Sequence, residues 1–211
     1  MTDIASMELT DVQIDASRAR LEGLRSRMAE TDLGGLLVSA ENDIWYLTGF
    51  VGHSALLLVT ANRAVIICDR RYEEFLQAWD ACELFEVVMG ARHKLGQEVK
   101  RLAGEEDLSS VGIQGESMTI SFRDSLAASV DGLELSPTTG LVSHLRQCKR
   151  PEELALIERA IAIQEQALEE SLAQLEPGMT EFEFTSLLEY RLRMAGASGA
   201  SFEPIVGSGP N

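Results

Sequence analysis

Residues 54–68 read Ser-Ala-Leu-Leu-Leu-Val-Thr-Ala-Asn-Arg-Ala-Val-Ile-Ile-Cys, and this stretch decides how the first half of the chain folds. It contains two apolar runs, residues 54–60 and 63–68, which Ala61 and Asn62 join. Two short apolar runs that are separated by two residues, one of them Asn, are typical of a β-hairpin. Neither run alternates apolar with polar side chains, so both strands are predicted to be buried on both faces of a sheet.

Helical and strand-like segments alternate on either side of this hairpin. Apolar residues recur at helical spacing from Asp15 to Met28, and a Gly-Gly pair then precedes a strand over residues 36–38. Residues 41–47 are short and aromatic and end at a Thr-Gly pair. After the hairpin, the pattern predicts helices over residues 69–80, 94–103 and 119–130, and strands over residues 83–89, 109–114 and 133–136.

This alternation predicts an α/β domain over residues 15–146. Strands that alternate with helices form layered domains, so we expect a mostly parallel mixed sheet that helices cover, with the hairpin as its antiparallel part. Residues 1–14 show no firm period and are expected to form a flexible tail.

The pattern changes after residue 146, where two long amphipathic helices are predicted. The first begins at Pro151, which the first helical turn tolerates, and carries an apolar stripe that ends at Leu175. Its preceding residue, Arg150, offers no capping oxygen. The second helix begins with a capping box of Thr180 and Glu183, in which each residue satisfies the other's backbone N–H.

These two helices are not expected to be self-sufficient. Burial of six Leu or Ile side chains stabilises by roughly 9–18 kcal/mol at most, which two helices cannot obtain from each other alone. A sheet of the same unit should lie beneath them, and residues 202–206 supply at most one strand of it. We therefore expect residues 147–211 to be the first two helices and first strand of an unfinished unit.

The composition limits the classes of partner. The chain has 211 residues, 45% of them hydrophobic, and a formal net charge of −16, which disfavours a nucleic-acid partner. No apolar run approaches the ~20 residues of a membrane span, and the first residues lack the pattern of a signal peptide. Three cysteines without a C-x-x-C pair suit a reducing compartment, so a cytoplasmic protein is expected.

The sequence lacks the common catalytic motifs. Its three histidines, His53, His93 and His144, lie far apart and in no metal-ligand spacing. Neither a nucleophile elbow nor a phosphate-binding glycine loop that opens a helix is present. Asp69 and the two following arginines could recognise a carboxylate, although helix capping and pairing with Glu73 or Glu74 is the alternative use.

Several motifs together resemble one family. In the first half they are Asn42-Asp-Ile-Trp-Tyr-Leu-Thr-Gly-Phe50, Leu56-Leu-Leu-Val-Thr60 and Asp69-Arg-Arg-Tyr-Glu73. In the second half they are Leu145-Arg146, Lys149, Pro151-Glu152-Glu153, Ala160, Pro177-Gly178-Met179-Thr180-Glu181, Ser201-Phe202, Ile205-Val206 and Ser208-Gly-Pro-Asn211. The first set is similar to the amino-terminal domain of creatinase, prolidase and Xaa-Pro aminopeptidase. The second set is similar to the entry of their "pita-bread" α+β catalytic domain, and the resemblance covers residues 16–211.

The resemblance implies hydrolysis of the bond before proline in a peptide substrate. In this family, Asp, Asp, His, Glu and Glu hold two divalent metal ions, such as Mn, Co or Zn, that activate a bridging water. All of these ligands follow the Ser-Gly-Pro-Asn segment, as does the assisting histidine. The resemblance therefore assigns no catalytic and no metal-binding residue to this chain, and the chain alone is expected to be inactive.

The resemblance also implies a homodimer in which loops of the amino-terminal domain reach the partner's active site. The loop at residues 50–54 is the expected contributor, with Phe50 and His53 as substrate-binding candidates, although a plain turn explains the loop equally well. Phe202 could line the substrate cleft or be buried beneath the two helices. Two alternatives stay open: a non-catalytic dimerisation or binding module, and a creatinase-like relative or lyase with another reaction.

Overall fold

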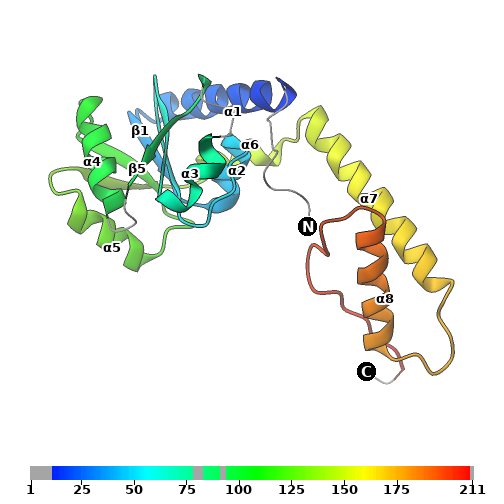
Figure 1. Ribbon diagram of the computed structural model, residues 1–211. Coiled ribbons are helices and arrows are strands. Elements are labelled where there is room, and N and C mark those ends of the chain that lie inside the picture. Colours follow the sequence, from blue (N-terminus) through cyan, green and yellow to red (C-terminus); the bar gives the residue numbers. More distant parts are fainter. Residues whose placement is uncertain (1–10, 78–82, 91–93, 210–211) are drawn as a thin grey trace. The chain divides into compact units, whose positions relative to one another are not determined.

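The computed structural model describes residues 11–77, 83–90 and 94–209 (Figure 1). The described residues form two compact units, which divide after Cys148. The first unit is an α/β domain, and the second contains two helices. The expected helix over residues 69–80 falls partly outside the described residues, as do most of the expected tail, Cys82 and His93.

The first unit is built on a six-stranded mixed sheet. Its strands are β1 (Gly35–Val38), β2 (Leu56–Thr60), β3 (Ala64–Cys68), β4 (Glu86–Met89), β5 (Ser110–Gln114) and β6 (Glu134–Thr138), in the order β4-β3-β2-β1-β5-β6. Strand β2 runs antiparallel to β1 and β3, whereas the other three pairs are parallel. The predicted mostly parallel mixed sheet with one hairpin is therefore confirmed.

Both strands of the hairpin lie inside the sheet, each between two neighbours. All ten residues of β2 and β3 are buried, as the unbroken apolar runs predicted. The turn is closed by Thr60, whose backbone N–H donates to the carbonyl of Arg63 at 2.9 Å and whose hydroxyl accepts from the Arg63 N–H at 3.0 Å. Asn62 is exposed in this turn. The contact through the Thr60 hydroxyl was not indicated by the sequence pattern.

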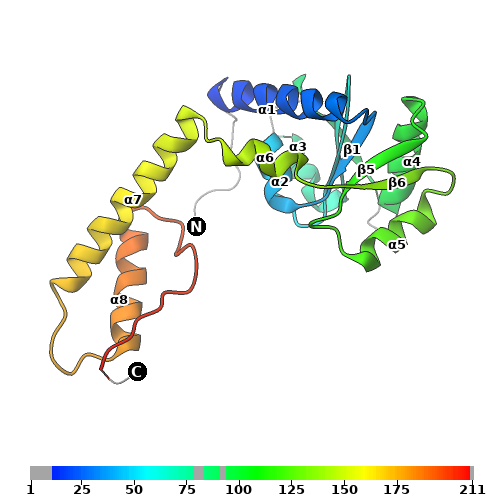
Figure 2. The ribbon, with the colours of Figure 1, turned by 180° about the vertical axis from the view of Figure 1, so that it is seen from behind.

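Helices cover both faces of the sheet. On one face, α1 (Asp11–Glu30), α2 (Glu41–Thr48) and α6 (Leu141–Gln147) pack with the alternate strand residues Leu36, Leu57 and Ile66. On the other, α4 (Leu95–Glu105) and α5 (Ile120–Ser129) pack on Leu37, Leu58 and Ile67. Figures 1 and 2 show α4 and α5 together, on the opposite side of the sheet from α1. Because strand residues alternate between faces, these apolar runs supply two cores at once.

Three local features differ from the sequence-based expectation or were not covered by it. Helix α1 begins at Asp11, so residues 11–14 belong to it and not to a tail. Residues 41–48 form α2, which ends at Gly49, and the φ of 75° at Gly49 suits a residue without a Cβ. Helix α6 was not expected, because its seven residues are too few to show a firm period.

The segment after β3 also differs in detail. Residues Arg70–Tyr72 form a 3₁₀ turn, η2, and residues Glu73–Gln77 form α3. Asp69 caps the turn, since its carboxylate accepts from the Arg71 N–H at 3.0 Å. The expected capping use of Asp69 is confirmed. The arginines were expected to pair with Glu73 or Glu74, whereas Arg71 forms its ion pair with Asp69 at 2.6 Å, two residues away.

Strand β6 lies at one edge of the sheet and contains Pro137. The Glu134 N–H donates to the Ser109 carbonyl at 3.0 Å, and the Thr138 carbonyl accepts from the Gly115 N–H at 2.9 Å. Residues 134 and 138 therefore direct their backbone groups toward β5. In a parallel ladder, successive residues direct their backbone groups alternately to the two sides of the strand, so the backbone groups of Pro137 point away from β5.

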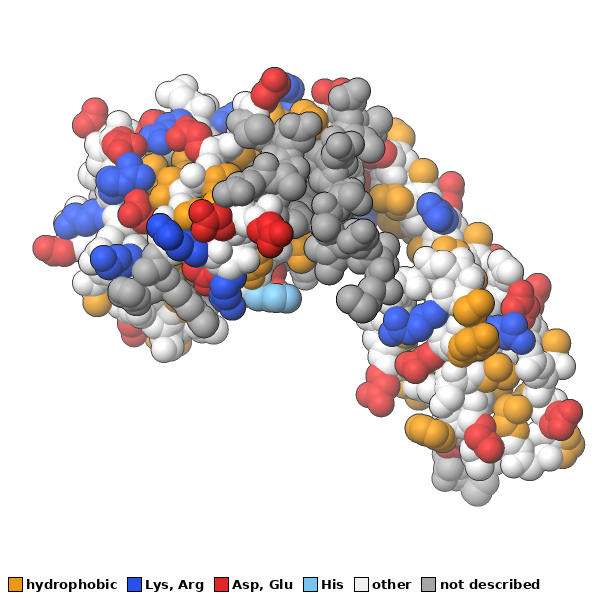
Figure 3. Space-filling model, viewed as in Figure 1, with side chains coloured by type: hydrophobic (Ala, Val, Ile, Leu, Met, Phe, Trp, Pro, Cys, Tyr) orange, Lys and Arg blue, Asp and Glu red, His pale blue; other side chains and the backbone are white. Residues whose placement is uncertain are grey.

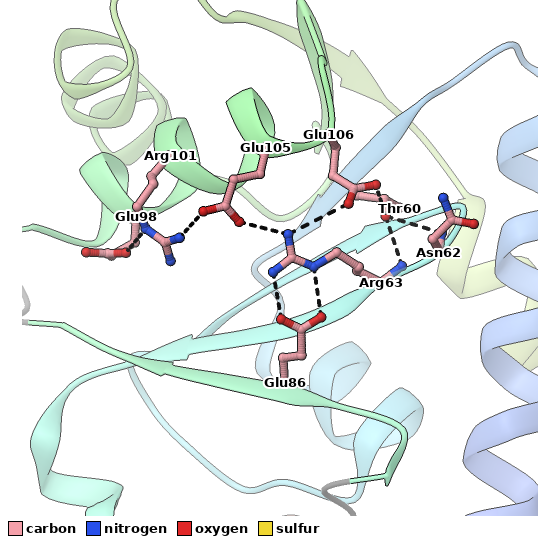
Figure 4. Close-up of polar contacts among 8 residues, drawn as sticks. All are labelled: Thr60, Asn62, Arg63, Glu86, Glu98, Arg101, Glu105 and Glu106. Atoms are coloured by element: carbon pink, nitrogen blue, oxygen red, sulfur yellow. Dashed lines mark hydrogen bonds and ion pairs between the residues drawn. The ribbon is translucent and has the colours of Figure 1, made fainter.

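A cluster of ion pairs joins the hairpin turn to β4 and α4 (Figure 4). Arg63 binds Glu86 through two hydrogen bonds of 2.8 and 2.6 Å and Glu105 through one of 2.9 Å. Arg101 extends the cluster through Glu98 and Glu105, and the Thr60 hydroxyl donates to Glu106 at 3.2 Å. These contacts lie at the end of the sheet where β2 ends and β3 begins.

The second unit consists of α7 (Pro151–Leu172) and α8 (Glu181–Met194), which pack on each other. The predicted capping box of α8 is confirmed. The Thr180 hydroxyl accepts from the Glu183 N–H at 3.2 Å, and the Glu183 carboxylate accepts from the Thr180 N–H at 2.8 Å. At α7, Glu153 accepts from the Arg150 N–H at 3.0 Å, which supplies one of the two bonds of such a box.

The apolar stripes of these helices remain partly uncovered. Exposed apolar residues lie along α7 and α8, and Figure 3 shows hydrophobic side chains spread over this unit. Phe182 is 80% exposed and Ile205 is 93% exposed. Residues 202–206 form no strand, so the predicted first strand of this unit is wrong for the described chain. A strand requires a hydrogen-bonded neighbour, and the described residues of the unit offer none.

We predict that Arg63→Met destabilises the first unit in a pH-dependent manner. Hydrogen bonding to Arg63 holds the pKa of Glu86 below its usual range. The native state therefore binds this proton less tightly than the unfolded chain, so the ion pair stabilises above the ordinary glutamate pKa and the effect is lost as the pH falls. We expect a loss of about 1 kcal/mol at neutral pH, measured by urea unfolding, because the pair is partly exposed.

The matched control is Arg70→Met, which removes an exposed arginine that lies outside this cluster. It should change the free energy of unfolding little at any pH. The difference between the two variants should shrink as the pH falls through about 4. Equal destabilisation by both variants, or an effect that does not depend on pH, would show that the cluster contributes nothing specific.

We predict that Thr180→Ala frays the start of α8. Loss of a helix-capping hydroxyl costs about 1 kcal/mol, and Thr180→Ser should restore most of it because serine keeps the oxygen. Hydrogen exchange of the Glu183 amide, which donates to Thr180, should accelerate in the alanine variant and not in the serine variant. Equal exchange rates in all three chains would contradict the capping role.

Candidate functional site

The candidate site lies at the end of the sheet opposite the Arg63 cluster. Strands β1 and β3 run against β2, β4 runs with β3, and β5 and β6 run with β1. Five strands therefore end at the edge where β2 begins. In open α/β sheets, binding sites form in the loops beyond the carboxyl ends of the strands.

The loop from Gly49 to Ala55 crosses this edge and carries His53. The side chain of His53 is 81% exposed, and its Nδ1 lies 2.9 Å from a carboxylate oxygen of Glu41, at the start of α2. The backbone N–H of His53 donates to the hydroxyl of Tyr72 at 2.9 Å. Two contacts, from α2 and from η2, thus hold a solvent-facing imidazole in a defined orientation.

Phe50 lies beneath this loop. Its side chain is fully buried, and its ring meets the ring of Tyr72 edge-on, with centroids 5.3 Å apart. A Cβ at Gly52 would come within 2.5 Å of the Phe50 ring, so only glycine lets the loop pass this closely. In this structure, Phe50 supports the loop from below and does not reach solvent.

An exposed arginine completes the polar groups near this edge. Arg71 binds Asp69 with both Nε and Nη2, and its guanidinium lies 5.8 Å from the centre of the Tyr72 ring. Hydrogen bonding to Asp69 raises the pKa of Arg71, so this side chain stays charged. These contacts link Glu41, His53, Asp69, Arg71 and Tyr72, which we call the carboxyl-edge cluster.

The imidazole of the carboxyl-edge cluster faces a carboxylate. This histidine is exposed, and no described nucleophile is hydrogen-bonded to its imidazole. Cys68, the last residue of β3, is buried, and burial raises the pKa of its thiol to about 11. A thiol with so high a pKa remains protonated at neutral pH and is a poor nucleophile.

Phe202 lies in the second unit and is 73% exposed. The alternative that the two helices bury it is therefore wrong for this chain. The Ser208 N–H donates to the Glu181 carboxylate at 2.8 Å and so connects the segment after Phe202 to α8.

The described residues do not fit a metal centre. Over residues 11–77, 83–90 and 94–209, no three His, Cys, Asp or Glu side chains are grouped so that they could hold a metal ion. A two-metal site needs several carboxylates that converge on one point. No step of metal chemistry is therefore assigned to these side chains. In the same part of the chain, none of the helices has the length and apolarity needed to cross a membrane.

Two residues of the cluster were not identified as site candidates from the sequence. Tyr72 belongs to the Asp69-Arg-Arg-Tyr motif, but nothing in a linear motif indicates that its hydroxyl meets a loop 19 residues earlier. Glu41 lies in the first turn of α2, where the helix dipole favours acidic residues, but this helix was not predicted from the sequence.

Comparison with known families agrees with this architecture. Residues 20–148 match the family described as Creatinase/Prolidase N-terminal domain, and residues 155–211 match metallopeptidase family M24. The first match covers more than half of the chain, and its end coincides with the division after Cys148.

Individual relatives match over both units. An uncharacterized peptidase of Bacillus subtilis, YqhT, is 30% identical over 190 residues, which are 90% of this chain and 53% of that protein. An Xaa-Pro dipeptidase structure from Bacillus anthracis superposes with a TM-score of 0.78 at 29% identity, covering 88% of this chain and 51% of that one. The N-terminal domain of the cytoplasmic peptidase PepQ from Mycobacterium tuberculosis gives a TM-score of 0.53 at 31% identity, covering 61% of this chain and 98% of that one.

The chain spans about half the length of the curated relatives that it matches. On the family match over residues 20–148, the chain belongs to the creatinase/prolidase family.

Proposed function

We propose that the protein to which this chain belongs is a metal-dependent peptidase that hydrolyses the bond before proline. The observation that carries the proposal is the order of the two family matches, an amino-terminal domain followed by a metallopeptidase M24 segment. The similarity to an Xaa-Pro dipeptidase across both units supports the same substrate class.

We propose that the catalytic metals are bound by residues outside those described here. A pair of divalent ions such as Mn, Co or Zn, held mainly by carboxylates, would activate water for attack on the peptide bond. The described residues contain no group of side chains suited to that task, so this chain alone should not turn over peptide.

In this proposal, the amino-terminal unit limits access of substrate to the catalytic centre. The loop from Gly49 to Ala55 presents His53 to solvent, and Phe50 supports it from below. The exposed ring of Phe202 would line the substrate cleft. The protein would act as a homodimer and, like the relative described as a cytoplasmic peptidase, would act in the cytoplasm.

A second candidate function is a dimerisation or binding module without catalysis. The observation that favours it is the uncovered apolar surface of α7 and α8, which is typical of helices that pack against a further partner. A creatinase-like relative with another reaction shares the same fold, because the fold does not choose the chemistry.

We predict that the longer product of this gene, loaded with Mn²⁺, cleaves Xaa-Pro dipeptides, and that this 211-residue chain does not. Activity should be lost on treatment with a chelator and restored by Mn²⁺, as expected for metal-activated water. Release of free proline measures the reaction. Matched dipeptides with alanine in place of proline are the control for specificity.

The outcomes distinguish the candidate functions. Turnover of Xaa-Pro substrates only by the longer protein supports the peptidase. Chelator-resistant turnover, or robust metal-dependent turnover by the 211-residue chain, contradicts it. A longer protein that is inactive with every divalent metal, but dimeric, would favour the binding module.

We predict that His53→Ala raises KM for Xaa-Pro dipeptides in the longer protein about tenfold and changes kcat much less. A residue that helps to position substrate without touching the reacting bond acts mainly on binding. The matched control is His144→Ala, because His144 is also exposed but lies on α6. A similar KM in both variants would exclude a substrate role for His53.

A further inference from the structure

A buried polar network lies directly beside the candidate site, and Gln114 is at its centre. The side-chain carbonyl of Gln114 accepts from the backbone N–H groups of Ser39 and Ala40 at 2.8 and 2.9 Å. Its amide nitrogen donates to a carboxylate oxygen of Asp43 at 2.6 Å. Gln114 is the last residue of β5, so one side chain joins that strand to the segment between β1 and α2.

Asp43 carries the network further. It is 5% exposed and lies in the first turn of α2, and its second oxygen accepts from Arg146 at 2.7 Å. Arg146 is near the end of α6, the last helix of the first unit. A buried carboxylate requires this degree of pairing, because an uncompensated charge in the interior is costly.

The network holds the start of α2 in place of a capping side chain. Ala40 precedes the helix and has no side chain that could cap it. Instead, Gln114 holds the backbone at Ser39 and Ala40, and Asp43 holds the first turn from within. The next residue after this held segment is Glu41, whose carboxylate meets the ring of His53.

We propose that Gln114 and Asp43 are positioning residues for His53. They fix the start of α2 and so place the Glu41 carboxylate within hydrogen-bonding distance of the imidazole. Through this contact they set the orientation of the loop from Gly49 to Ala55. The effect on substrate binding rests on the proposed peptidase function, whereas the effect on the His53 ring does not.

Polarity, and not only volume, is what the network requires. An ionised aspartate can only accept hydrogen bonds, so Gln114 must present its NH₂ group to Asp43 and its oxygen to the two backbone N–H groups. The same reasoning assigns the proton of His53 to Nδ1, since an ionised Glu41 can only accept. These assignments can be tested by exchanging donor and acceptor.

The test combines two variants. Gln114→Glu places a second carboxylate against Asp43, and Asp43→Asn removes the charge that pairs with Arg146. The double variant, Gln114→Glu with Asp43→Asn, restores the hydrogen-bond pattern with no change in net charge, because the amide and the carboxylate have exchanged places. We expect each single variant to be impaired and the double variant to recover.

Two measurements report the result. In the 211-residue chain labelled with ¹⁵N-histidine, the ring nitrogen signals of His53 should move in each single variant toward those of Glu41→Gln and should return in the double variant. In the longer, metal-loaded protein, KM for an Xaa-Pro dipeptide should rise about tenfold in each single variant and recover in the double, with kcat nearly constant.

Glu86→Gln is the control for a general loss of stability, because it weakens the Arg63 cluster at the opposite end of the sheet. It should leave the His53 signals and KM unchanged. Single variants that leave the His53 signals unmoved, or a double variant that does not recover, would overturn the proposal. Moved signals with an unchanged KM would overturn its substrate-binding half. Absence of any Xaa-Pro hydrolysis in the unmodified longer protein would refute the peptidase function but leave the NMR result decisive for positioning.

Discussion

The arrangement of the first unit depends on a strand that runs against its neighbours. Strand β2 is buried on both faces between β1 and β3, and both of these run antiparallel to it. Had β2 been parallel, a crossover helix would have been needed on each side of it. Instead, a tight turn joins β2 to β3, and the segment with α2 joins β1 to β2, so that the ends of β1 and β3 lie beside the start of β2. The loop with His53, the first turn of α2 and the Asp69 turn consequently meet at one edge.

Patterns within a segment were readable from the sequence, whereas contacts between segments were not. Unbroken apolar runs predicted buried strands, and the Thr180-Glu183 spacing predicted a capping box, because both depend on residues that are close along the chain. Gln114 meets Ala40 across 74 positions, and Arg146 meets Asp43 across 103. No local pattern encodes such pairings, so the network that holds α2 became visible only in the fold.

The two sequence-based site candidates in the loop differ in their exposure to solvent. His53 is exposed, as a recognition residue should be, while Phe50 is buried and supports the loop that carries it. The family resemblance of the loop made both residues candidates, but it could not indicate which of the two side chains faces solvent. The expected strand at residues 202–206 depended on a neighbouring strand outside the segment. An apolar run can indicate the tendency to form a strand, but it cannot supply the partner.

The proline in β6 restricts how two copies of this protein could associate. Because residues 134 and 138 direct their backbone groups toward β5, Pro137 turns its nitrogen to the open side of the sheet, where a further strand would have to bind. A nitrogen without a hydrogen cannot donate to that strand, and proline on an edge is a known protection against sheet extension. A dimer formed by continuing the sheet across β6 is therefore disfavoured. Association through helices or loops would meet no such obstacle, and the same proline would protect the unit from edge-to-edge aggregation.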